Sequence, residues 1–322
     1  CMPNGFSTNG GQTQNPYGPF ETFGSSSGSA VSVSADLVTL DGEGLSTVIM
    51  IEYATNAKIS DLTITGGNGY TGGGIICNFS NSMIENVVFT DNVSTYGGGI
   101  YIGDHSTAEI RESTLTNNTA DRGGAICITN YSDPLLKDLF VESNTAQHGG
   151  GIYVENHSGP TLENVWLSGN TASTDGGGIH CFSQSTPLLK NTRIVGNSSL
   201  NEGGGIWCSQ NSTVSFDTAD RSTIYLNMSL TGNDLYSDNY MMVVVDTFTV
   251  MYPKNYHASP LNNFDFDILS GLYPQVNADL YVSPEGDNAN SGLTPDDPLR
   301  TIHFATSVIA EDSLNMYTIH LA

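Results

Sequence analysis

A short pattern of small and apolar residues recurs six times along the chain. Each copy is Gly-Gly-Gly or Gly-Gly-Ala followed by Ile, and successive copies begin 25, 26, 26, 27 and 27 residues apart. A second pattern, an apolar residue followed three places later by Asn, accompanies five of these copies. The first glycines of the six copies are Gly72, Gly97, Gly123, Gly149, Gly176 and Gly203. A constant period of this size indicates a solenoid, in which each repeat stacks on its neighbours.

Each repeat contains several short strands. In the repeat that begins at Gly149, Ile152 and Val154 alternate with other residues, and further apolar positions follow after a Gly-Pro turn. Strands this short, separated by Gly, Asn, Asp and Pro, exclude a helical repeat. At roughly 3.3 Å per residue, one repeat holds three strands and three turns around a packed interior. Parallel pairing of equal positions predicts an all-β fold, a right-handed parallel β-helix with about 25–27 residues per rung.

Equal positions of successive repeats form columns. The Ile that ends each glycine phrase and the residue two places later are both predicted to point into the interior. The second of these columns includes Cys181 and Cys208, which we interpret as small buried thiols, because a disulfide between in-register parallel strands would be strained. The Asn column is predicted to form a ladder of amides that satisfies backbone groups of the turns. Its members are Asn92, Asn118, Asn144, Asn170 and Asn197.

The pattern divides the chain into four parts. Residues 1–30 are rich in Gly, Ser and Asn and are predicted to be a linker or the end of a preceding unit. Residues 31–240 form the β-helix, and residues 241–278 are predicted to be a cap and connector, because an uncovered last rung would be an aggregating edge. Residues 279–322 combine a strand, an acidic loop, a helical pattern and a strand, which indicates the truncated start of a second β-helix. We therefore expect the chain to be a segment of a longer protein.

Composition and charge limit the classes of partner that the chain can bind. The 322 residues carry 33 acidic and 9 basic side chains, for a net charge of −24. Such a surface repels phosphate backbones and anionic lipids, which argues against nucleic acid and membrane surfaces as partners. The chain has no apolar run of about 20 residues, the length that a transmembrane helix needs. Five Cys without framework spacing do not predict a disulfide scaffold.

Two stretches resemble known families. The Gly-Gly-Gly-Ile phrase paired with apolar-x-x-Asn resembles the repeat of polymorphic outer-membrane proteins. The lead-in from Thr39 to Asn68, and again the stretch from Tyr281 to Ile302, resemble the first rungs of secreted bacterial right-handed β-helix proteins with the pectin-lyase-like fold. The resemblance implies a secreted or cell-surface bacterial protein. It implies no single activity, because this fold carries lyases, hydrolases, epimerases, adhesins and passive stalks. The polygalacturonase signature is absent from the sequence, so no catalytic residue is carried over.

The column just before the glycines holds the candidate catalytic residues. Asp175 and Glu202 are predicted to lie about one rung apart, close to the carboxylate separation of a retaining glycosidase, with His148 beside them. The alternative interpretation is a ladder of complementary charges along a turn.

Aromatic residues suggest a ligand-binding face. Tyr101, Tyr153, His180 and Trp207 share the column just after the interior Ile and are predicted to point outward, and Phe140 and Trp166 are neighbours in another outward column. Exposed rings along a parallel sheet can stack on sugar faces. The alternative is surface aromatics that stabilise the sheet.

The acidic loop near the C-terminus contains candidate metal ligands. Asp287, Asn288 and Asn290 offer oxygen atoms of the kind that Ca²⁺ prefers, and a plain polar turn is the alternative interpretation. No other cofactor is predicted.

These observations favour a non-catalytic adhesion or polysaccharide-binding module at a cell surface, with extracellular polysaccharides or host glycans as partners. Two alternatives remain open. One is a carbohydrate-active enzyme, either a polysaccharide lyase or a glycoside hydrolase. The other is a passive structural spacer.

Overall fold

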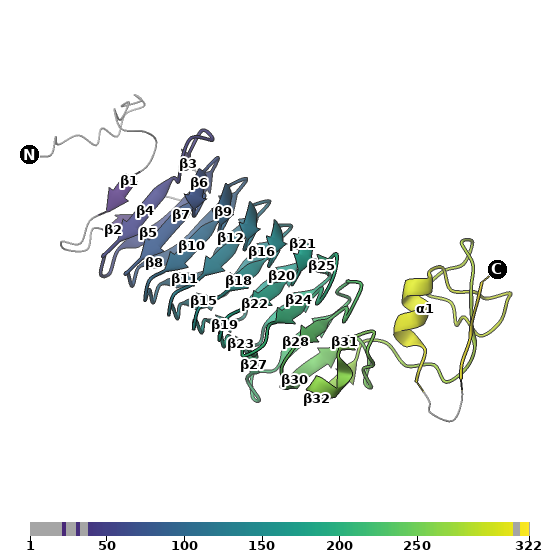
Figure 1. Ribbon diagram of the computed structural model, residues 1–322. Helices are drawn as coiled ribbons and strands as arrows, with labels where there is room; N and C mark the ends of the chain where they lie inside the picture. Colours follow the sequence, from purple (N-terminus) through teal and green to yellow (C-terminus); the bar gives the residue numbers. More distant parts are fainter. Residues whose placement is uncertain (1–20, 24–29, 33–37, 312–315, 322) are drawn as a thin grey trace, which may run out of the picture.

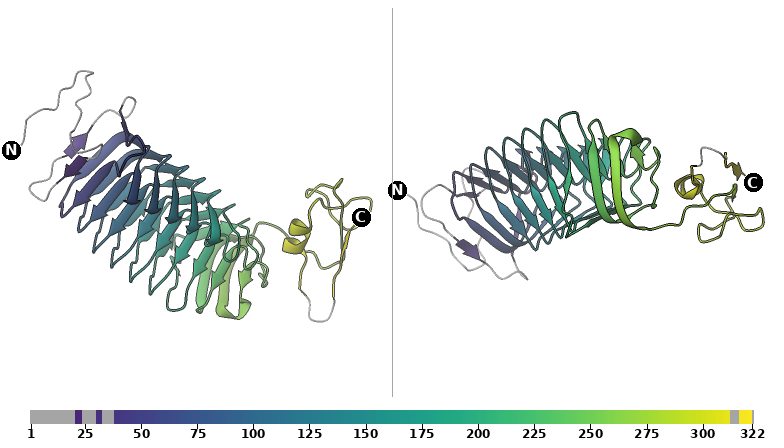
Figure 2. Two further views of the ribbon diagram at one scale, coloured as in Figure 1. Left: turned by 45° about the horizontal axis from the view of Figure 1, so that its top comes forward. Right: turned by 90° about the horizontal axis from the view of Figure 1, so that it is seen from below.

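The chain folds into a parallel β-helix followed by a small separate unit (Figure 1). The computed structural model describes residues 38–311 and 316–321, together with the backbone of Glu21–Phe23 and Ala30–Ser32. Over these residues the solenoid makes about nine turns, and Figure 2 shows the successive coils from two further sides. The predicted all-β, parallel β-helical fold is confirmed.

Three parallel sheets run along the solenoid. Sheet A consists of β1 (Glu21–Phe23), β4 (Ile49–Glu52), β7 (Ile75–Asn78), β10 (Ile100–Gly103), β14 (Ile126–Ile128), β18 (Ile152–Val154), β22 (Ile179–Cys181), β26 (Ile206–Cys208), β29 (Leu235–Ser237) and β31 (Ala258–Ser259). Sheet C consists of β6 (Asn68–Thr71), β9 (Val93–Tyr96), β13 (Thr119–Arg122), β17 (Thr145–His148), β21 (Thr171–Asp175) and β25 (Ser198–Ser199).

Sheet B is the largest, because most rungs contribute two strands to it. It consists of β2 (Ala30–Ser32), β3 (Thr39–Asp41), β5 (Lys58–Thr65), β8 (Met83–Thr90), β11 (Glu109–Arg111), β12 (Thr114–Thr116), β15 (Leu135–Lys137), β16 (Phe140–Glu142), β19 (Thr161–Glu163), β20 (Trp166–Ser168), β23 (Leu188–Lys190), β24 (Arg193–Val195), β27 (Ser215–Phe216), β28 (Ser222–Tyr225), β30 (Met241–Phe248) and β32 (Phe264–Gly271). Equal positions pair in parallel along all three sheets, as the columns predict, with register shifts between β17 and β21 and between β28 and β30.

The glycine phrase makes the turn from sheet C into sheet A. Gly149 has a φ of +65°, a conformation that residues with a side chain rarely adopt. A Cβ atom on Gly150 would lie 2.6 Å from the carbonyl oxygen of Gly177 in the next rung. The first two glycines are therefore required by backbone conformation and by close approach of neighbouring rungs. Ala125 takes the third position of one copy without exposure to solvent.

The interior is filled by the predicted columns. The Ile column and the column two places later are completely buried, and Cys181 and Cys208 are adjacent free thiols. Cys1 lies outside the described residues.

The Asn column forms a continuous buried ladder. Each side chain donates from Nδ2 to Oδ1 of the Asn in the next rung, over 2.9–3.1 Å, from Asn92 as far as Asn227. Each Oδ1 also accepts the backbone N–H of the preceding Asn, over 3.0–3.2 Å. The ladder ends on Asp234, whose Oδ1 accepts from Asn227 over 3.0 Å.

The segment predicted to cap the solenoid also extends it. β30 pairs in parallel with β28, and β32 pairs with β30 over seven register positions. The apolar pattern of residues 241–248 lies outside the glycine repeat, yet Val243 and Val245 are buried in the common core. Arg221 ties these strands together by donating to the carbonyl oxygens of Val245 and Asp267.

The C-terminal unit has its own small core. β33 (Leu280–Val282) pairs in parallel with β34 (Ile319–Leu321), and helix α1 (Ile302–Val308) packs beside them. The 3₁₀ turn η1 (Leu261–Asn263) lies before β32. Of the segment 1–30 that is predicted to be a linker, the structure describes β1 and Ala30 alone.

We predict that Asn144→Ala destabilises the solenoid by about 2–4 kcal/mol. The change leaves the buried backbone N–H of Asn118 without an acceptor, removes one acceptor of the Asn118 side chain, and removes the donor to the carbonyl oxygen of Leu115. Urea unfolding followed by circular dichroism measures this loss. Gln147→Ala, an exposed change in the same rung, is the matched control and should change stability by less than about 0.5 kcal/mol. Equal stability of the two variants would contradict a structural role for the ladder.

The end of the ladder predicts a pH dependence. Burial raises the pKa of Asp234 from 3.8 to about 6, so the folded state holds this proton more tightly than the unfolded state. The stability that this proton contributes is complete below about pH 4 and is lost as the pH rises through 6. Asp234→Asn should therefore be more stable than the parent above pH 6, by on the order of 2–3 kcal/mol, and equally stable near pH 4.

Thermal unfolding of both proteins between pH 4 and 8 tests this expectation. Asp238→Asn, an exposed change four residues away, serves as the control. A constant difference between Asp234→Asn and the parent at all pH values would show that the carboxyl group does not titrate as described.

Candidate functional site

Two columns that are separate in the sequence meet at one corner of the solenoid. The residue before the glycines ends a strand of sheet C, and the residue after the Ile lies in a strand of sheet A. The tight glycine turn brings these positions together. The rings of His148 and His180 are 5.1 Å apart, and the guanidinium group of Arg122 lies 5.3 Å from the Tyr96 ring and 5.5 Å from the Tyr153 ring. We call this strip the glycine corner.

The aromatic column along the glycine corner is stacked and largely closed. His180 stacks on Tyr153 at 4.8 Å and on Trp207 at 4.2 Å. Tyr153 and His180 are 3% and 4% exposed, so the prediction that their ring faces are open to a ligand is wrong. The reason is that the spacing between rungs is close to the stacking distance of aromatic rings, so each ring covers its neighbour. Tyr101 and Trp207 are partly exposed.

His148, Asp175 and His180 form a cluster in this corner. One potential ligand atom of each lies within 4.8 Å of the others, and Nδ1 of His148 is 3.7 Å from Oδ2 of Asp175. Nδ1 of both imidazoles is buried and has no hydrogen-bond partner among the described residues. Among these residues, this is the one group of three or more His, Cys, Asp and Glu side chains close enough to share a metal ion. All three residues are candidates from the sequence, His148 and Asp175 for catalysis and His180 for ligand binding.

Burial sets the protonation of the cluster. Burial lowers the pKa of His148, with a further contribution from Arg122, and it lowers the pKa of His180 well below its ordinary value. Burial also raises the pKa of Asp175, and the neighbouring charge of Glu202 acts in the same direction. Both imidazoles are therefore neutral near pH 7, with a nitrogen lone pair available.

The predicted carboxylate pair, Asp175 and Glu202, lies on adjacent rungs. Oε2 of Glu202 accepts a hydrogen bond from Nε1 of Trp207 over 2.9 Å. The side chain of Asp175 is 15% exposed. Asp175 is therefore mostly buried, and Glu202 is partly exposed but hydrogen-bonded to Trp207.

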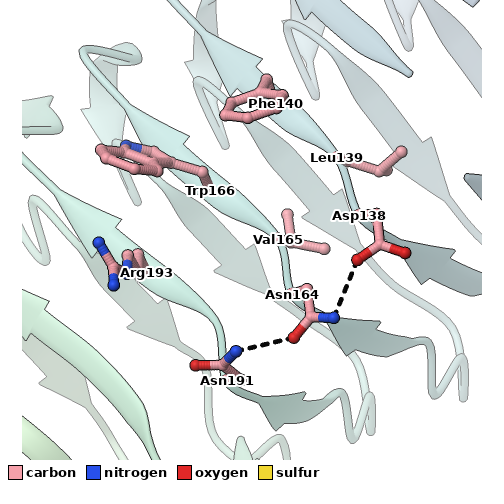
Figure 3. A pocket seen from close by; sticks show the side chains of 8 residues that line it. All are labelled: Asp138, Leu139, Phe140, Asn164, Val165, Trp166, Asn191 and Arg193. Carbon is pink, nitrogen blue, oxygen red and sulfur yellow. Dashed lines mark hydrogen bonds between the residues drawn. The ribbon is translucent and has the colours of Figure 1, made fainter. Parts of the chain in front are cut away.

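Sheet B carries a more open hollow of about 330 Å³ (Figure 3). Phe140 and Trp166 stand on adjacent strands with ring centroids 6.3 Å apart, and they are 49% and 37% exposed. The guanidinium group of Arg193, one strand further, lies 5.3 Å from the Trp166 ring. The hollow is lined by Asp138, Leu139, Phe140, Asn164, Val165, Trp166, Asn191 and Arg193.

A row of polar turn residues forms the other side of this hollow. Asn191 donates to Asn164 over 2.8 Å, and Asn164 donates to Asp138 over 2.9 Å, as Figure 3 shows. All three have a positive φ, which Asn and Asp tolerate better than other residues with a side chain. The two rings are predicted from the sequence, whereas the polar row and the contact of Arg193 with Trp166 are not. The recurrence of Asp or Asn at this turn in most rungs is the signal that could have revealed the row.

The candidate calcium loop is held by its own hydrogen bonds. Oδ1 of Asp287 accepts from the backbone of Ala289, and Oδ1 of Asn288 accepts from the backbone of Arg300 and of Thr301. Asn290 donates to the carbonyl oxygen of Pro298. These contacts account for the loop shape without an ion.

The fold and the columns define a class of protein, the right-handed parallel β-helices. Residues 47–239 match the family described as "Right handed beta helix region", and this match covers more than half of the chain. The chain therefore belongs to this family. Comparisons with curated proteins and with solved structures find no significant match. Among the described residues, no helix is long and apolar enough to cross a membrane.

Proposed function

We propose that this chain is a non-catalytic glycan-binding module of a secreted or cell-surface bacterial protein. The hollow on sheet B is its binding site. The observation that carries the proposal is the pair of exposed rings, Phe140 and Trp166, on adjacent rungs.

The rings suit the apolar faces of sugars. Aromatic side chains combine a large apolar face with defined geometry, and exposed apolar patches rimmed by polar groups mark binding sites. Because the two rings follow each other along the solenoid axis, a linear polysaccharide that lies along this axis contacts both. Unlike the rings of the glycine corner, they keep much of their area in solvent.

The polar lining supports the same ligand class. Asn164 and Asn191 place amide groups beside the rings, and Asp138 adds a carboxylate. Such groups pair with hydroxyl groups and fix the orientation of a ligand, as in other small-molecule sites. Arg193 places a guanidinium group beside Trp166, where it balances the charge of Asp138 and can donate hydrogen bonds to sugar hydroxyl or carboxylate groups.

The alternatives have less support. A glycosidase needs two carboxylates open to substrate, whereas Glu202 is held by Trp207 and Asp175 is mostly buried. A passive spacer requires neither exposed rings nor a polar hollow. We infer the secreted or surface location from the proposed ligand class, because polysaccharides of this kind are extracellular, and from the acidic surface. This inference depends on glycan binding.

We predict that Trp166→Ala weakens binding of the polysaccharide that the parent protein binds about tenfold, since the loss of one ring contact costs about 0.5–1.5 kcal/mol beyond the loss of buried area. Affinity electrophoresis against a panel of acidic and neutral polysaccharides, with product analysis, measures both binding and cleavage. Arg193→Ala should weaken binding to the acidic members more than to the neutral ones.

Tyr70→Ala is the matched control, because Tyr70 is 72% exposed on sheet C. It should bind like the parent protein. If Trp166→Ala and Tyr70→Ala bind equally well, the hollow is not the site. If the parent protein binds no member of the panel, the spacer interpretation replaces the proposal, and cleavage of a member would replace it with the enzyme.

A further inference from the structure

We propose that the glycine corner binds a divalent transition-metal ion, Zn²⁺ in the first instance, through His148, Asp175 and His180. The three ligand atoms come from the ends of β17 and β21 and from the middle of β22. The site is separate from the hollow on sheet B, so it does not depend on glycan binding.

The geometry is close to that of a bound ion. Zn²⁺ lies about 2.0–2.2 Å from nitrogen and oxygen ligands, so two ligand atoms of a tetrahedral site are roughly 3.4 Å apart. Nδ1 of His148 and Oδ2 of Asp175 are 3.7 Å apart, and all three ligand atoms lie within 4.8 Å of one another. Small rotations of the two partly exposed side chains, His148 and Asp175, close the remaining difference.

The unpaired imidazole nitrogens are a second, independent observation. His180 is 4% exposed, and its Nδ1 has no hydrogen-bond partner among the residues that the structure describes. Nδ1 of His148 is in the same situation. Buried polar atoms are nearly always paired, and an unpaired one in a native fold calls for an explanation such as an ion. Because both imidazoles belong to the cluster, a metal ion held between them supplies that explanation.

The surrounding charges favour a cation. Glu202 lies beside Asp175 on the next rung, and Arg122 is a cationic side chain whose charge reaches both imidazoles. Arg122 lies 3.4 Å from Glu155 and between the rings of Tyr96 and Tyr153. Because Arg122 is paired with Glu155, the carboxylates of Asp175 and Glu202 make this corner negative, which favours a divalent cation.

The ligand set selects the kind of metal. Two imidazoles and one carboxylate suit Zn²⁺ and its neighbours, whereas Mg²⁺ and Ca²⁺ prefer oxygen ligands alone. Three protein ligands leave a fourth position for water or for an anionic group of a ligand, as in open zinc sites. The exposed edge of His148 lies on the solvent side of the cluster.

A second pair of histidines provides a control inside the same chain. His105 and His157 stack on opposite faces of Tyr131, at 5.3 and 4.8 Å, and are therefore two rungs apart. One ion cannot reach both, because each must lie about 2 Å from the metal. The double variant His105→Phe, His157→Phe removes as many imidazoles as a double change in the cluster without touching the proposed ligands.

The test is zinc binding by the full chain. Untagged protein with Cys1→Ser, so that neither a histidine tag nor the first thiol contributes, is stripped with chelator and titrated with Zn²⁺ by calorimetry. Metal content after dialysis is measured by mass spectrometry. We expect one equivalent per chain, and at least a 100-fold loss of affinity in His148→Ala and in Asp175→Asn. The control double variant His105→Phe, His157→Phe should still bind one equivalent of Zn²⁺ per chain.

His180→Phe tests the third ligand while it preserves the stack between Tyr153 and Trp207. Its circular dichroism without metal should match that of the parent protein, and Zn²⁺ should raise the melting temperature of the parent but not of the variant. If His180→Phe does not fold, the zinc affinities of His148→Ala and Asp175→Asn test the proposal. Failure of the parent to retain Zn²⁺, or retention by both His148→Ala and Asp175→Asn, would overturn the proposal.

Discussion

The buried amide ladder is the constraint on which the rest of the structure depends. Each Asn side chain donates to the amide of the next rung and accepts from the backbone of the preceding one, so a whole turn of the chain is held in register by a single residue. These amides are fully buried, and an unpaired buried amide is costly. A rung that slipped by one residue would break the ladder and also turn its apolar residues outward. Register, once set, places every equal position directly above the last.

This stacking produces both candidate sites, the glycine corner and the hollow on sheet B. In the glycine corner, the rings of consecutive rungs stack at 4.2–4.8 Å, so each ring covers the face of its neighbour. In one outward column of sheet B, Phe140 and Trp166 are flanked by Thr114 and Arg193. These neighbours leave the two rings 49% and 37% exposed. The same periodicity therefore gives a closed polar cluster on one face and an open aromatic hollow on another.

The two candidate sites differ in what the solenoid contributes to them. The hollow lies on one face of consecutive strands of sheet B, and these strands position its lining residues. The cluster of His148, Asp175 and His180 exists because two sheets meet at a turn of three glycines. Burial then keeps the imidazoles neutral and leaves their nitrogens without partners. The two proposed sites therefore lie in columns that do not touch.

The sequence by itself determined the period, the strand-and-turn character of each rung, the interior columns and the Asn ladder, because each of these depends on equal positions in successive repeats. It also identified both columns of the glycine corner and the Phe140–Trp166 pair. The tertiary structure alone decided which columns meet and which rings stay exposed. His148 and His180 are separated by a turn and a rung. The glycine pattern is typical of turns with positive φ, but it does not specify the angle at which the turns at Gly149 and Gly176 bring sheet C against sheet A. Burial of Tyr153 and His180 likewise follows from the distance between rungs, a property of the assembled sheets and not of any one repeat.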